Sequence, residues 1–99
     1  ESRFAKAYCS GKFRIKSWGR IKIRYSMKQK GISETCIREG LEEIDAEEYL
    51  KCLKNLIEKR MKSPNDLSTY PKQAKMANYL RNKGFEVDLI WREIRRVSG

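Results

Sequence analysis

Residues 18–44 read WGRIKIRYSMKQKGISETCIREGLEEI, and they decide the fold because the end of the chain repeats their pattern. When Gly31 is aligned with Gly84, an offset of 53 residues, apolar positions coincide without a gap. The matching pairs are Ile23 and Met76, Met27 and Leu80, Ile32 and Phe85, Ile37 and Ile90, Leu41 and Ile94, and Ile44 and Val97. Apolar residues that recur at a fixed offset between variable neighbours are typical of repeated packing units. The sequence therefore predicts a tandem repeat.

Helical spacing of the apolar residues predicts six helices. We expect them at residues 2–9, 17–30, 33–44, 45–62, 69–83 and 86–97. The residues that can cap or break them are Ser17, Ser33 and Asp45 at N-termini, Gly31 and Gly84 at C-termini, and Pro64 and Pro71 around a turn-rich linker. Each type suits its position: Ser and Asp accept a backbone hydrogen bond, Gly adopts the left-handed conformation, and Pro suits a first turn.

The first expected helix is short. Phe4 and Tyr8 are four residues apart and form a small helical stripe, which Gly11 can end. Residues 12–16 alternate like a strand, but a lone strand has nothing to pair with, so we expect a connector there.

The offset of 53 also pairs Phe4 with Ile57, and it places the partners of earlier residues in the fourth helix at or before residue 1. The interpretation is an all-α chain of two tandem three-helix repeats, 1–44 and 45–99, with the first helix trimmed at its N-terminus. The expected core residues are Ile37, Leu41, Leu53, Ile57, Leu80, Ile90 and Ile94.

The composition argues against an enzyme. The chain has no histidine, so a histidine-based metal site or catalytic pair is excluded, and its six glycines form no phosphate-binding loop. We expect no cofactor, no metal and no small-molecule substrate. Its three cysteines form no close pair and read as reduced thiols of a cytoplasmic protein. No apolar run approaches the ~18 residues of a membrane span.

The net charge of +10 is distributed unevenly. Residues 1–31 hold ten basic residues and one acidic residue, residues 32–60 five against eight, and residues 61–99 eight against four. The basic residues that we expect to bind a partner are Arg14, Lys16, Arg20, Lys22, Arg24, Lys28, Lys30, Arg81 and Lys83. Such a cluster suits a polyanion or an acidic protein groove, although a solvated helix face is the plainer alternative.

Three of these residues, Arg20, Arg24 and Lys28, recur at helical spacing and would lie in one row. Neighbouring like charges on a helix are unfavourable by ~0.2–0.5 kcal/mol per pair. From the sequence, a partner explains such a row better than folding does.

Several phrases of the sequence resemble the RecX family, the bacterial regulators of the RecA recombinase. They are RFAKAY at residues 3–8, Phe13-Arg14, Trp18-Gly19, Lys22-Ile23, KQKGIS at residues 28–33, and YLRNKGF at residues 79–85 with Ile90 following. RecX proteins are usually built of three tandem three-helix repeats, so this chain looks like the second and third. Two positions depart from the pattern: Glu86 stands where the first copy has Ser33, and Gly40 stands where the family tends to have alanine.

The resemblance implies a non-catalytic role in recombination, repair and the SOS response. RecX-like proteins lodge in the groove of the RecA–single-stranded DNA filament and restrain its growth, ATP hydrolysis and strand exchange. Two hypotheses follow: a modulator that binds the recombinase filament, or a basic helical module that binds single- or double-stranded DNA directly. The basic cluster serves either, because the filament offers acidic protein and phosphate together.

Overall fold

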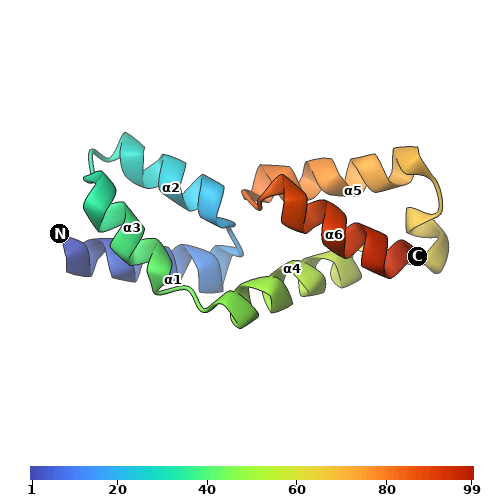
Figure 1. The fold of residues 1–99 in the computed structure, drawn as a ribbon, viewed down its shortest axis with the longest axis horizontal. Helices are drawn as coiled ribbons and strands as arrows, with labels where there is room; N and C mark the ends of the chain where they lie inside the picture. The colour runs from blue at the N-terminus through green and yellow to red at the C-terminus, as the bar shows by residue number, and fades with distance from the viewer.

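The computed structural model describes all 99 residues and contains six α-helices, one short 3₁₀ helix and no strand. The elements are α1 (Ser2–Lys16), α2 (Arg20–Gln29), α3 (Glu34–Glu42), α4 (Ala46–Arg60), η1 (Pro64–Leu67), α5 (Tyr70–Lys83) and α6 (Val87–Ser98). Helices α1–α3 form one end of an elongated molecule and α4–α6 the other (Figure 1), with principal extents of 46 × 21 × 19 Å. The prediction of an all-α fold is confirmed.

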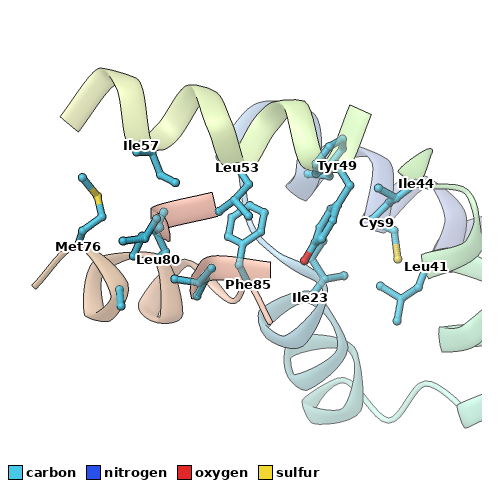
Figure 2. Packing of buried hydrophobic residues seen from close by; sticks show 14 of the residues in the cluster. Cys9, Ile23, Leu41, Ile44, Tyr49, Leu53, Ile57, Met76, Leu80 and Phe85 are labelled. Carbon is cyan, nitrogen blue, oxygen red and sulfur yellow. The ribbon is translucent and has the colours of Figure 1, made fainter. Parts of the chain in front are cut away.

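One hydrophobic core runs through both ends of the molecule. Its 18 buried residues form a single cluster, and Figure 2 shows it passing from Cys9 and Leu41 through Tyr49 to Leu53 and Leu80. All seven residues expected in the core are buried. The helical spacing of the sequence therefore identified the inner faces of α3, α4, α5 and α6 correctly.

The prediction for the first helix was wrong. Helix α1 does not end near Cys9 but continues through Gly11 and the expected connector to Lys16. Its buried residues are Ala5, Cys9 and Phe13, an i, i+4, i+8 column that packs on the core. A glycine inside a helix costs only about 1 kcal/mol, which the burial of Phe13 offsets.

The repeat is real, but its first helices match at a different offset. The buried column of α4 is Tyr49, Leu53 and Ile57, which lies 44 residues after Ala5, Cys9 and Phe13 rather than 53. Helices α1 and α4 each have 15 residues. The pairing of Phe4 with Ile57 was therefore wrong. The second copy contains a longer connection before α5, which includes η1.

The caps mostly follow the sequence. The side chains of Ser33 and Asp45 accept hydrogen bonds from the backbone N–H groups of Cys36 and Glu48, at 3.3 and 3.0 Å. Gly31 and Gly84 adopt φ angles of 78° and 101°, as expected for left-handed C-terminal residues. Ser17 is the exception.

Ser17 does not start α2. It ends α1 in the left-handed conformation, with φ 57°, and α2 begins after Gly19 instead. The chain reverses between the two helices within Ser17, Trp18 and Gly19.

Gly40 allows α1 and α3 to pack closely. A Cβ atom at this position would lie 2.8 Å from the backbone oxygen of Ala5 and 2.9 Å from Sγ of Cys9. Close packing is thus the reason for a glycine inside α3.

Candidate interaction surface

The two three-helix units meet end to end where α5 finishes and α2 begins (Figure 1). The backbone N–H groups of Gly19 and Ile21 donate to the carbonyl oxygens of Lys83 and Gly84, at 2.7 and 3.0 Å. The N–H groups at the start of a helix and the carbonyl groups at its end have no partner within that helix. At this joint the unpaired N–H groups of α2 therefore bond to the unpaired carbonyl groups of α5. The backbones are too close for side chains: a Cβ on Gly19 would lie 2.4 Å from Gly84, and one on Gly84 would lie 2.4 Å from Cβ of Lys22.

An aromatic cluster fills the inside of this joint. Tyr49 lies between Phe13 and Phe85, with ring centroids 5.9 and 5.1 Å apart. Its ring is fully buried, and Figure 2 shows its hydroxyl directed towards α2.

The Tyr49 hydroxyl donates to Oε1 of Glu86 at 2.6 Å and accepts from the backbone N–H of Arg20 at 2.9 Å. Burial raises the pKa of Tyr49 well above the ordinary value for tyrosine, and the hydrogen bond to Glu86 raises it further. The Arg20 guanidinium lies 3.9 Å from the Tyr49 ring centroid and pairs with Oε2 of Glu86 at 3.1 Å. Arg20, which the sequence analysis placed among the partner-binding residues, thus belongs to the network of hydrogen bonds and ion pairs that joins the two units.

Lysines gather on the outside of the same joint. Lys83 donates from Nζ to the backbone oxygen of Lys16 at 2.9 Å, and Nζ of Lys22 lies 3.4 Å from the backbone oxygen of Asn82. Nζ of Lys22 also lies 4.7 Å from the ring centroid of Trp18. We call Lys16, Trp18, Lys22 and Lys83 the joint surface. Six ion pairs occur in the structure, and none includes a lysine of this surface.

A row of aromatic rings and lysines extends the joint surface along α1. Lys12 bridges two rings, with Nζ 4.9 Å from the centroid of Trp18 and 5.4 Å from that of Tyr8. Lys30, the residue after α2, approaches the Tyr8 ring at 5.6 Å, and Phe4 stacks on the same ring at 5.8 Å. Cations over aromatic faces are held in place without losing their charge.

Lys12 was absent from the sequence-based set. The spacing of four residues between Tyr8 and Lys12 could have predicted this contact, because residues four apart are neighbours on a helix. That prediction required α1 to continue past Gly11, which the sequence analysis did not expect.

The row of Arg20, Arg24 and Lys28 does not carry unpaired charge. Arg24 and Lys28 both pair with Glu34, at 2.8 and 2.9 Å, and Arg20 pairs with Glu86. The pKa of Glu34 is lowered, and its hydrogen bond with Lys28 is the largest cause. The energetic argument from the sequence is weakened here, because two carboxylates, Glu34 and Glu86, offset part of the repulsion within the fold. A partner for this row stays a prediction.

The remaining predicted residues are dispersed. Arg14 pairs with Glu48 at 3.3 Å on the side facing α4. Arg81 is exposed in the last turn of α5, the turn that also carries Lys83. The structure therefore brings Lys16, Lys22 and Lys83 together, and it commits Arg14, Arg20, Arg24 and Lys28 to ion pairs.

Trp91, on α6, is half-buried. It stacks nearly parallel on the exposed Tyr70, with centroids 5.8 Å apart and an interplanar angle of 6°. None of the helices has the length and apolar character needed to cross a membrane.

Comparison with known protein families divides the chain in the same way as the fold. Residues 1–41 match the family model for the second three-helix domain of RecX, and residues 47–94 match that for the third. No solved structure gives a significant match.

Several similar proteins have the curated name "Regulatory protein RecX". That of Clostridium tetani is 34% identical over 97 residues, which cover 96% of this chain and 42% of the relative. The protein of Clostridium botulinum (strain Eklund 17B) is 36% identical, and the match covers 80% of this chain and 38% of the relative. The protein of Chlorobaculum tepidum is 30% identical, and the match covers 97% of this chain and 58% of the relative. The chain thus spans about half the length of the relatives that it matches.

Proposed function

The chain belongs to the RecX family, and from this premise we propose that it is a non-catalytic modulator of recombination and repair, which binds the RecA–single-stranded DNA filament and restrains recombinase activity. Its relatives are named as regulatory proteins. The filament as partner comes from the resemblance of the sequence to this family. Filaments form on DNA, so we place the protein in the cytoplasm.

The joint surface is the observation that carries this proposal. Nζ of Lys83 contacts the backbone of Lys16, Nζ of Lys22 contacts the residue before Lys83, and none of the six ion pairs includes these three lysines. A like-charged cluster without internal compensation attracts an oppositely charged partner over long range. The filament presents phosphate and acidic protein side by side, so it suits this surface.

The joint also fixes the relative placement of the two units, 1–44 and 45–99, which we propose act as one rigid body. Backbone hydrogen bonds and the Tyr49–Glu86–Arg20 network hold them together. A rigid, 46 Å long body loses less conformational entropy on binding than two loosely linked units would.

The test is inhibition of ATP hydrolysis by the preformed filament. The variant Lys16→Ala/Lys22→Ala/Lys83→Ala should inhibit less and with a flatter salt dependence, since each lost phosphate contact lowers the logarithmic salt slope by roughly 0.7 for single strands. The control Lys51→Ala/Lys54→Ala/Arg92→Ala removes the same charge elsewhere and should inhibit like the parent protein. Equal inhibition by both variants and the parent would contradict the proposal.

Direct binding of DNA is the second candidate function. It is favoured by the aromatic rings of Tyr8 and Trp18 beside Lys12 and Lys22, because rings and cations together suit stacked bases and their phosphates. Under this alternative, bare single-stranded DNA would bind the protein as tightly as the filament does.

A further inference from the structure

A second basic region lies far from the joint, where α4 ends, η1 turns and α5 begins. It is a pocket of about 560 Å³ with Met76 as its one apolar lining residue. Five cations line it: Lys59, Arg60, Lys62, Lys72 and Lys75. The sequence did not single out this set, because its members come from two separate segments, residues 59–62 and residues 72–75.

Most of the positive charge of this basic pocket is left uncompensated within the chain. None of the six ion pairs of the structure includes any of its five cations. Asp66 is its one acidic lining residue, and Oδ2 of Asp66 accepts from the backbone N–H groups of Lys62 and Ser63, at 2.6 and 3.2 Å. These hydrogen bonds lower the pKa of Asp66, the one from Lys62 most. The charges of Lys72 and Lys62 also lower the pKa of Asp66, so this carboxylate offsets one of the five positive charges and leaves the lining with a net charge of +4.

Two of the cations are held in place before any ligand arrives. The guanidinium of Arg60 lies 3.9 Å from the ring centroid of Tyr79. A ring contact uses the face of the guanidinium and leaves its N–H edge available to an anion. Nζ of Lys72 lies 3.1 Å from the backbone oxygen of Asn65, which ties α5 to η1. Prior ordering of this kind lowers the entropic cost of binding.

We propose that the basic pocket binds closely spaced phosphate groups, as carried by a nucleic acid backbone or a free oligophosphate. Phosphate fits better than a carboxylate because it brings more negative charge and more acceptor oxygens to a site with five cations. One phosphate group cannot neutralise five cations, so the pocket suits a ligand that carries several. The inference is independent of the joint surface and does not rest on the proposed function.

The test uses two probes, tripolyphosphate and a thymidine oligonucleotide, in separate NMR titrations of the backbone amides. Both should shift residues 59–75 most. The variant Lys72→Ala/Lys75→Ala should bind at least about tenfold more weakly, because each lost hydrogen bond to a charged group contributes more than a neutral one. Lys59→Ala/Lys62→Ala, on the other wall, should give the same loss and replaces the first variant if that one unfolds.

The control is Arg92→Ala/Arg95→Ala, which removes the same charge from the exposed side of α6 and should bind like the parent. The probe that binds more tightly identifies the source of the phosphate, and either result supports the proposal. Three results would overturn it: shifts confined to the joint surface, an equal loss in the control, or a glutamate-rich peptide that binds as tightly as both probes.

Discussion

Removing one hydroxyl group from the joint should weaken the fold measurably. In Tyr49→Phe the ring remains between Phe13 and Phe85, but Glu86 loses a hydrogen bond of 2.6 Å and the backbone N–H of Arg20 loses its acceptor. A hydrogen bond to a charged group contributes about 1.5–3 kcal/mol, and an orphaned partly buried donor adds to the loss. Glu86 keeps its ion pair with Arg20, which limits the damage. We expect a loss of about 2 kcal/mol, or roughly 8–16 °C in Tm for a domain of this size.

Urea and thermal unfolding measure this loss, and a double-mutant cycle with Glu86→Gln assigns it. The cycle should give a coupling free energy of about 1 kcal/mol or more, because the two side chains are in direct contact. Tyr79→Phe is the matched control, since its ring contacts Arg60 and no hydrogen bond of its hydroxyl is present in the structure. A loss below about 0.5 kcal/mol for Tyr49→Phe would refute the reasoning, because that is the range of ordinary surface substitutions.

Three other predictions follow from the same structure. Gly19→Ala should destabilise the fold, since its Cβ would lie 2.4 Å from the Gly84 backbone. Gly11→Ala should instead stabilise α1 by up to about 1 kcal/mol, because a Cβ there meets nothing within 4 Å, and chemical denaturation of both variants measures the difference. The raised pKa of Tyr49 favours the neutral side chain in the folded state, so the contribution of Tyr49 to stability is complete below the ordinary pKa of about 10 and is lost as pH rises further. Unfolding measured at increasing alkaline pH should show this loss of stability, and the Tyr49→Phe variant should not show it. Burial raises the pKa of the Cys9 thiol to about 11, so alkylation at pH 8 should leave Cys9 unmodified in the folded protein; labelling of Cys9 at the rate of the unfolded chain would contradict the packing.

The sequence predicted those features that depend on local patterns. Apolar spacing located the buried faces of α3 to α6, and single residues such as Ser33, Asp45 and Gly84 marked helix ends through their own chemistry. The first helix was misjudged because Gly11 was given more weight than the column of Ala5, Cys9 and Phe13, which includes small or weakly apolar residues.

The site was harder to predict because it depends on which segments meet. Glu34 pairs with both Arg24 and Lys28 from another helix, so part of the repulsion expected from the sequence is offset in the fold. Lys83 and Lys22 are far apart in the chain and meet only because α5 and α2 join end to end. No spacing rule within one segment contains that information.

The most direct measurement of the central claim is binding to a labelled single-stranded oligonucleotide, bare or coated with recombinase, at one salt concentration. The account predicts tighter binding to the coated strand, and a weaker complex for Lys16→Ala/Lys22→Ala/Lys83→Ala than for the control Lys51→Ala/Lys54→Ala/Arg92→Ala. Equal affinity for the bare and coated strands, or an unchanged complex with the joint-surface variant, would contradict it.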